Sequence, residues 1–99
     1  MLTIERSTEG KKLELSLIGR LDTTTAPDLE KEVKGGIEGV EDLIFDFSKL
    51  EYISSAGLRV LLSAQKVMNQ QGNMVVKKAS DEIKEIFEVT GFSDILTIE

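Results

Sequence analysis

A chain of 99 residues with 40% hydrophobic and 30% charged side chains is expected to fold as one domain over residues 1–99, and this composition excludes a disordered segment. Its formal net charge of −6 argues against nucleic acid or a membrane surface as a partner. It contains no histidine and no cysteine, so the commonest general base, the usual nucleophile–base pairs and the usual zinc ligands are absent. We therefore expect no catalytic site and no metal site, and the absence of a signal peptide predicts a cytoplasmic protein.

The first third of the chain predicts a hairpin followed by a helix. Alternating apolar residues indicate strands over 2–6 and 13–18, and residues 19–24 are expected to form a loop. The segment TAPD at 25–28 matches a capping box with proline in the first helical turn, where its missing N–H costs little. The helix should end at the glycines 35–36. Its apolar stripe consists of Ala26, Leu29, Val33 and Ile37.

The middle of the chain predicts a strand, a loop and a second helix. A nearly continuous apolar run over 43–47 suits a strand covered on both faces, and a loop is expected over 48–53. Ser54 and Ser55 then stand at a helix start, where a hydroxyl can bond to a free backbone N–H group. The face toward the sheet is expected to consist of Gly57, Val60, Leu61, Ala64, Val67 and Met68. The opposite face carries Arg59, Ser63, Lys66 and Gln70.

The last third predicts a strand, a third helix and a final strand. Residues 71–73 read as a helix stop, 74–77 as a short strand and 95–98 as the last strand. Ser80 is expected to cap a helix that Gly91 closes. Its buried stripe consists of Ile83, Ile86 and Phe87. The order β-β-α-β-α-β-α-β indicates an α/β fold with a mixed, mostly parallel sheet that carries helices.

The two adjacent serines admit more than one interpretation. Only one of Ser54 and Ser55 can be the helix cap, so the other hydroxyl is free, and the small residues Ala56 and Gly57 leave it accessible. One possibility is that both serines serve only the helix start. The other is phosphorylation, because the N–H groups of a helix start receive a phosphate well. A nucleophilic serine is disfavoured, since the segment lacks a G-x-S-x-G elbow and no histidine is present to activate a hydroxyl.

The stretch YISSAGL at 52–58 resembles the signature of the STAS domain, specifically that of the bacterial anti-sigma factor antagonists, which typically read [D/S]-S-[S/T/A]-G-L. The resemblance extends over nearly the whole chain. It includes the segments GRLD at 19–22, DFS at 46–48 and TGF at 90–92. In that family the serine two residues before the glycine is the phosphoacceptor, and this position is Ser55 here.

The resemblance implies a partner-switching module that is not an enzyme. Its unphosphorylated form would bind an anti-sigma factor, a serine kinase that brings its own ATP and magnesium, and would thereby release a sigma factor. Phosphorylation of Ser55 would end the association and a serine phosphatase would restore it. The protein itself would then need no cofactor, and we expect a monomer when it is free. The implied partner-binding residues are Asp22, Thr23, Thr24, Ser54, Ala56, Gly57, Leu58, Arg59 and Leu62.

Several of these positions keep two interpretations open. Many family members carry aspartate where this chain has Ser54, so either hydroxyl is a candidate phosphoacceptor. Arg59 replaces a frequent glycine and either pairs with the phosphate or a partner carboxylate, or is a solvated surface side chain. Leu58 and Leu62 are either partly exposed anchors for a partner or residues covered by a neighbouring loop. Residues 22–24 either contact the partner or cap the helix that follows.

Two further functions are alternatives to the phosphorylation switch. A STAS-type domain that is never phosphorylated would act as a constitutive scaffold or as a small-molecule sensor. A small hydrolase that uses Ser55 is the least favoured hypothesis, because the chain offers no base to activate this hydroxyl.

Overall fold

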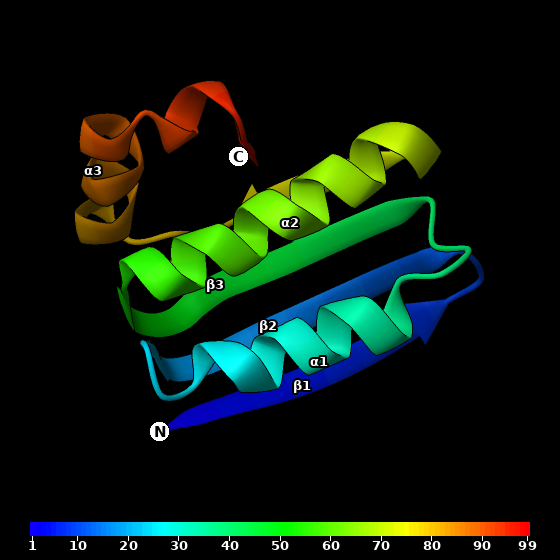
Figure 1. Ribbon diagram of the computed structural model, residues 1–99, viewed down its shortest axis with the longest axis horizontal. Helices are drawn as coiled ribbons and strands as arrows, with labels where there is room; N and C mark the ends of the chain where they lie inside the picture. Colours follow the sequence, from blue (N-terminus) through cyan, green and yellow to red (C-terminus); the bar gives the residue numbers. More distant parts are fainter.

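The computed structural model describes residues 1–99 and contains one five-stranded sheet with helices packed on one face (Figure 1). The strands lie in chain order across the sheet; β1 and β2 are antiparallel, and every other neighbouring pair is parallel. This confirms the predicted element order and mixed sheet. The strands are β1 (Leu2–Glu9), β2 (Lys12–Leu21), β3 (Asp42–Ile53), β4 (Asn73–Lys77) and β5 (Thr97–Ile98). The helices are α1 (Ala26–Gly36), α2 (Ser55–Gln71), α3 (Asp81–Thr90) and the 3₁₀ helix η1 (Phe92–Asp94).

The helices cover only one of the two faces of the sheet. In Figure 1, α1 and α2 lie side by side in front of β1–β3, and α3 lies beyond the start of α2. Leu13, Leu15 and Leu17 of β2 are completely buried beneath the helices, while the residues between them are only half-buried on the opposite face. The hydrophobic core therefore lies between the sheet and the helices, and the second face of the sheet remains uncovered.

The third helix closes one end of this core. The ring of Phe87 on α3 lies 6.4 Å from that of Phe47 on β3. Ser80 caps the helix as predicted, because its hydroxyl accepts a hydrogen bond from the N–H of Ile83 at 3.2 Å. Gly91 closes the helix in the left-handed conformation with φ of 83°, which glycine adopts without strain.

The predicted loop over 48–53 is wrong, because β3 continues through these residues to Ile53. Its pairing with β2 shifts twice, between Ser16 and Ile18 and again between Gly19 and Arg20, and β3 contributes one extra residue at each shift. Each extra residue reverses the alternation of side chains between the two faces. The period-two pattern that identifies a strand is therefore lost in the sequence, although the backbone stays extended. Residues 19–21 also belong to β2 and not to the predicted loop, because this strand stays paired with β3 up to the buried Leu21.

The buried face of α2 is rotated relative to the predicted one. Val67 was expected to face the sheet but is 42% exposed, whereas Leu58 and Gln65 are buried. The helix contacts β4 as well as β3, so its buried face is displaced toward Leu58 and Gln65 and away from Val67. Helical spacing identified the stripe, but the position of the neighbouring strand decided its borders.

The C-terminal segment also differs from its prediction. The last strand covers Thr97–Ile98, and the preceding residues form η1 and a turn in which Ile95 is 46% exposed. In the third helix, Ile83 and Phe87 are buried as predicted, and Ile86 is half-buried. No helix of this fold is long and apolar enough to cross a membrane.

Candidate functional site

The two serines at the start of α2 have different environments. Ser54 is the N-cap: its backbone is extended, and its hydroxyl accepts a hydrogen bond from the N–H of Gly57 at 3.4 Å. Its own N–H donates to the carbonyl of Leu21 at 2.9 Å, which ties the helix start to the end of β2. Ser55 is the first residue of the helix and is exposed, and of the two serine hydroxyls only that of Ser54 makes a hydrogen bond to another residue. One serine therefore holds the helix start and the other is free.

Gly57 allows the first turn of α2 to lie directly on the sheet. A Cβ atom at this position would lie 2.7 Å from Cγ of Leu21 and 3.0 Å from Cγ1 of Ile53, closer than packed atoms approach each other. The absence of a side chain at Gly57 thus brings the helix start against the ends of β2 and β3. This contact places Ser55 at the carboxyl edge of the sheet, beside the loop that follows β2.

The loop between β2 and α1 is held by Asp22. Its Oδ1 atom accepts hydrogen bonds from the N–H and hydroxyl of Thr24 at 3.0 and 2.8 Å, and from the N–H of Thr25 at 3.1 Å. The hydroxyl bond from Thr24 is the largest cause that lowers the pKa of Asp22, and the bonds from Thr25 act in the same direction. The carboxylate is therefore directed into its own loop, so Asp22 shapes this loop, and its hydrogen bonds end at Thr25, the residue before α1.

Thr25 does not form the predicted capping box. Its hydroxyl donates to the carbonyl of Arg20 at 2.8 Å and accepts from the N–H of Asp22 at 2.8 Å, and no side chain caps α1. The hydroxyl is drawn away from the helix because it satisfies polar backbone groups of the preceding loop, and Thr25 itself is 7% exposed. The prediction that the helix begins here, with Pro27 in its first turn, is confirmed.

A groove of about 380 Å³ separates the starts of α1 and α2. Its buried or half-buried lining side chains are apolar, and all of its exposed ones except Pro27 are polar. The groove joins the loop after β2 to the turn that contains the serines. Its lining consists of Thr23, Ala26, Pro27 and Glu30 on one side and Ala56, Arg59, Val60 and Ser63 on the other.

The structure brings most of the predicted partner-binding residues to this one surface. Thr23 and Thr24 are exposed beside the groove, Arg59 lines it, and Leu62 is half-buried further along α2. Leu58 differs, because it is 5% exposed and belongs to the hydrophobic core. Of its two interpretations, a partly exposed anchor or a covered residue, the structure confirms the second. A side chain buried on this side of α2 is not available as an anchor for a partner.

Five residues of the groove were not among the predicted partner-binding residues, namely Ala26, Pro27, Glu30, Val60 and Ser63. A signal for them exists, because 23, 26, 27 and 30 have the same spacing as 56, 59, 60 and 63. Each set forms one stripe on a helix and its preceding turn. What the sequence did not show is that these two stripes face each other, since this depends on how α1 and α2 pack.

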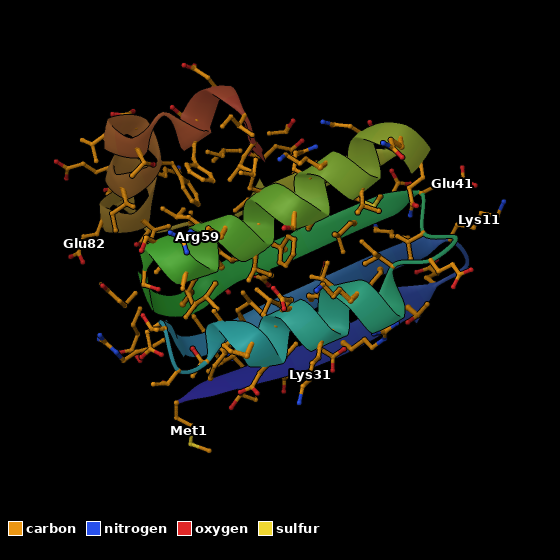
Figure 2. The ribbon with its side chains drawn as sticks, in the orientation of Figure 1. Met1, Lys11, Lys31, Glu41, Arg59 and Glu82 are labelled. Atoms are coloured by element: carbon orange, nitrogen blue, oxygen red, sulfur yellow. The ribbon has the colours of Figure 1, made fainter.

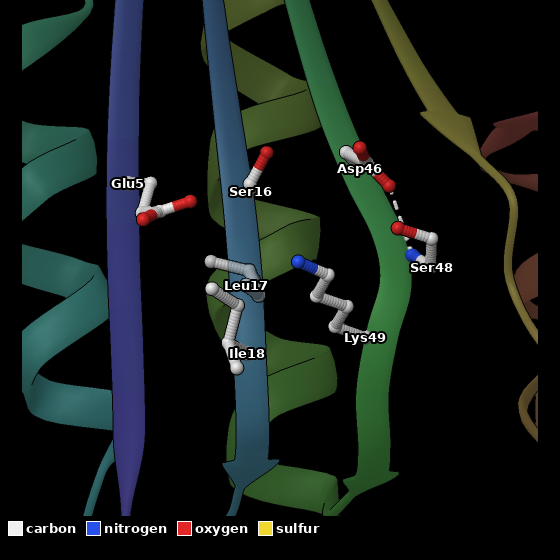
Figure 3. A pocket seen from close by; sticks show the side chains of 7 residues that line it. All are labelled: Glu5, Ser16, Leu17, Ile18, Asp46, Ser48 and Lys49. Atoms are coloured by element: carbon white, nitrogen blue, oxygen red, sulfur yellow. Dashed lines mark hydrogen bonds between the residues drawn. The ribbon is translucent and has the colours of Figure 1, made fainter.

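A second, smaller pocket lies on the uncovered face of the sheet (Figure 3). It measures about 60 Å³ and is lined by Glu5, Ser16, Leu17, Ile18, Asp46, Ser48 and Lys49. The N–H of Ser48 donates to Asp46 at 2.9 Å, and this bond is the largest cause that lowers the pKa of the Asp46 carboxyl. Figure 3 shows the helices behind the strands, so this pocket and the groove lie on opposite faces. No cluster of three or more acidic side chains lies close enough together to hold a metal ion.

Comparison with known proteins gives a consistent result over the whole chain. The sequence model of the STAS domain matches residues 3–99. The chain is 36% identical over 84 residues to BtrV of Bordetella bronchiseptica, which covers 83% of this chain and 72% of that protein. It is 30% identical over 99 residues to the anti-sigma-B factor antagonist of Staphylococcus aureus, which covers 98% of this chain and 92% of the relative.

Solved structures share the fold at lower sequence identity. An anti-sigma factor antagonist from Mycobacterium paratuberculosis matches with a TM-score of 0.89 and 20% identity, over 99% of this chain and 85% of that one. The phosphorylated form of the Bacillus protein SpoIIAA matches with a TM-score of 0.66 and 16% identity, over 100% of this chain and 91% of that one. Similarity at this level of identity establishes the architecture alone.

Proposed function

Because the chain belongs to the STAS domain family, we propose that it acts as an anti-sigma factor antagonist whose binding is controlled at Ser55. The unphosphorylated form binds an anti-sigma factor that is also a serine kinase, and a sigma factor is thereby released. Phosphorylation of Ser55 ends this association, and a serine phosphatase restores it. The observation that carries the proposal is the exposed, unbonded hydroxyl of Ser55 beside a helix cap already formed by Ser54.

A phosphate on Ser55 is compatible with the fold. The first turn of α2 carries no acidic side chain, so nothing on the helix already neutralises the positive end of its dipole. A phosphate adds a charge of about −1.5 to −2 at this position, where free N–H groups favour an anion. Since Ser54 caps the helix, the modification disturbs no hydrogen bond on which the helix start depends. The change therefore affects the surface and leaves the core intact.

The docking surface in this proposal consists of the loop 22–24, the start of α2 and the groove between them. Thr23, Thr24, Ser54, Ala56 and Arg59 present accessible atoms to a partner, and Leu62 adds half-buried apolar surface. Asp22 and Gly57 act indirectly, because one shapes the loop and the other sets the position of the helix. A negative charge at Ser55 would lie within this surface and would repel partner carboxylates.

The chemistry of the switch belongs to the partners. In the transfer, Oγ of Ser55 bonds to the γ-phosphorus of ATP, the bond from that phosphorus to ADP breaks, and the hydroxyl proton passes to a base of the kinase. The kinase supplies ATP and magnesium, so this chain needs no cofactor and catalyses no reaction. The proposal places the protein in the bacterial cytoplasm, where these partners act.

The proposal is tested by pull-down from a lysate of the native host. The bait is used as wild type, as Ser55→Asp and as Ser80→Asp, and retained proteins and bait phosphorylation are identified by mass spectrometry. Ser80→Asp is a matched control, because it adds the same charge at the exposed N-cap of α3, outside the docking surface, and aspartate is itself a good N-cap. We expect wild type and Ser80→Asp to retain an anti-sigma factor kinase, Ser55→Asp to lose it, and phosphate on the wild-type bait to map to Ser55.

Three results would contradict the proposal. If Ser55→Asp retains the same partners as wild type, a charge at this position does not control binding. If no phosphate is found at either serine under any growth condition, the constitutive scaffold or sensor becomes the better description. Phosphate at Ser54 alone would move the switch by one residue and would refute the assignment to Ser55.

A further inference from the structure

Arg59 differs from the other two arginines of the chain. Nη1 of Arg6 lies 3.1 Å from Oε2 of Glu32. The guanidinium of Arg20 lies 4.4 Å from the ring centroid of Tyr52 and 3.9 Å from Asp22. Arg59 forms no ion pair and no hydrogen bond, and its side chain is exposed near the start of α2 (Figure 2). In the unmodified protein the guanidinium of Arg59 therefore has no partner, and it lies near the proposed phosphorylation site, Ser55.

The helix geometry relates this cation to Ser55. The two residues are four positions apart within α2, so their Cβ atoms lie on the same face of the helix, about 5–6 Å from each other. An anion four residues before a cation is the favourable order for such a pair. A guanidinium also matches the oxygens of a phosphate in shape and can donate two hydrogen bonds to them.

No other charged group in the groove competes for Arg59. Glu30 on α1 is the only carboxylate in the lining, and its Oε1 atom lies 3.5 Å from Nζ of Lys34 on its own helix. Asp22, in the adjoining loop, accepts hydrogen bonds from Thr24 and Thr25. The first turn of α2 contributes no acidic side chain. The strongest anion within reach of Arg59 would therefore be a phosphate on Ser55.

We infer that Arg59 is the internal partner of phosphoserine at position 55, and that phosphorylation withdraws this cation from the docking groove. This inference rests on the proposed function and specifies its regulation. The modification then makes two changes to the groove at once: it adds a dianion at one end and removes a guanidinium from its wall. A partner that recognises the unmodified groove loses an attractive contact as well as gaining a repulsive one.

The test uses full-length protein with phosphoserine installed at position 55 during synthesis, and ³¹P NMR to follow the titration of the phosphate. Arg59 favours the dianion, so its loss in Arg59→Gln should raise the second pKa of the phosphate by about 0.3 unit. Arg59→Lys should preserve most of the wild-type value. Lys66→Gln is the matched control, because it removes a cation that lies about 16 Å from Ser55 along the axis of the same helix. This substitution should change the pKa of the phosphate by about 0.1 unit or less.

A second measurement reports withdrawal of the arginine directly. In ¹H–¹⁵N spectra, the Nε–H signal of Arg59 should shift and become protected from solvent exchange in the phosphorylated protein, while that of Arg6 should not change. Equal phosphate pKa values in wild type, Arg59→Gln and Lys66→Gln, with no change in the Nε–H signal, would show that Arg59 is only a solvated side chain. Because no kinase takes part, these measurements can fail while the pull-down succeeds, and the reverse.

Discussion

The starts of α2 and α3 use the same cap and differ in everything around it. Ser54 and Ser80 each accept a hydrogen bond from the N–H three residues later, at 3.4 and 3.2 Å. The first turn of α3 carries Asp81 and Glu82, which neutralise its dipole, whereas the first turn of α2 carries no acid and has a free hydroxyl at Ser55. Both helices have a serine cap, so the cap alone does not account for the phosphorylation that we propose at Ser55. What distinguishes α2 is a second, unbonded serine at a helix end whose charge is not yet balanced.

The start of α2 lies directly on the sheet at Gly57. Replacing Gly57 by valine should lower the free energy of unfolding by about 2–3 kcal/mol, because the new side chain overlaps Leu21 and Ile53. Urea denaturation measures this as a lower midpoint at unchanged slope. Gly35→Ala is the control: a Cβ there meets no atom within 4 Å, so this change should stabilise the protein slightly. Equal stability of Gly57→Val and wild type would mean that α2 does not rest on these residues.

Removing the hydroxyls one at a time separates capping from signalling. Ser54→Ala and Ser80→Ala should each destabilise the protein by about 1 kcal/mol, because each leaves the N–H groups of its helix start without a side-chain partner. Ser55→Ala should change stability by about 0.3 kcal/mol or less, since its hydroxyl is unbonded and exposed. Thermal or urea unfolding compares the three. A loss at Ser55→Ala as large as that at Ser54→Ala would reverse the assignment of cap and free hydroxyl.

The charge difference between the two starts predicts opposite responses to matched substitutions. Ser55→Asp should stabilise the fold by about 0.3–1 kcal/mol at neutral pH and low salt, because it adds the anion that α2 lacks. Asp81→Asn should destabilise it by a similar amount, because it removes one that α3 has. Ser55→Asn serves as the uncharged control. If Ser55→Asp destabilises the protein strongly, loss of binding by this variant can no longer be attributed to the surface alone.

The smallest expected effect is the contribution of Asp22 to the loss of stability at low pH. Its pKa is lowered in the folded protein, first by the hydroxyl of Thr24, so its contribution to stability is present above the unfolded value of about 3.9 and is lost as pH falls through the folded pKa. Asp22→Asn keeps an acceptor oxygen but cannot titrate. The free energy of unfolding should therefore fall less steeply in this variant below about pH 4. Thr24→Val should reduce the slope in the same direction, and an unchanged slope in both variants would exclude this role of Asp22.

Sequence patterns alone determined the element order, the fold class, the three helix starts, and the candidate serines. These features depend on local chemistry: serine hydroxyls cap α2 and α3, proline fits the first turn of α1, and glycines stand at the ends of all three helices. The family signature added Ser55 as the candidate phosphoacceptor, and this assignment stays a prediction. Sequence patterns did not predict the strand over 48–53, because its two register shifts depend on its pairing with β2.

Only the tertiary structure decided which residues share a surface. Val67 is exposed and Leu58 is buried because α2 contacts β4 as well as β3, and Pro27 and Glu30 join Arg59 and Ser63 in one groove because α1 and α2 lie next to each other. The division between Ser54 as cap and Ser55 as free hydroxyl likewise follows from the backbone geometry at the end of β3. Contacts between segments that lie far apart in the chain depend on packing, and the periodicity of a single helix carries no information about its neighbours.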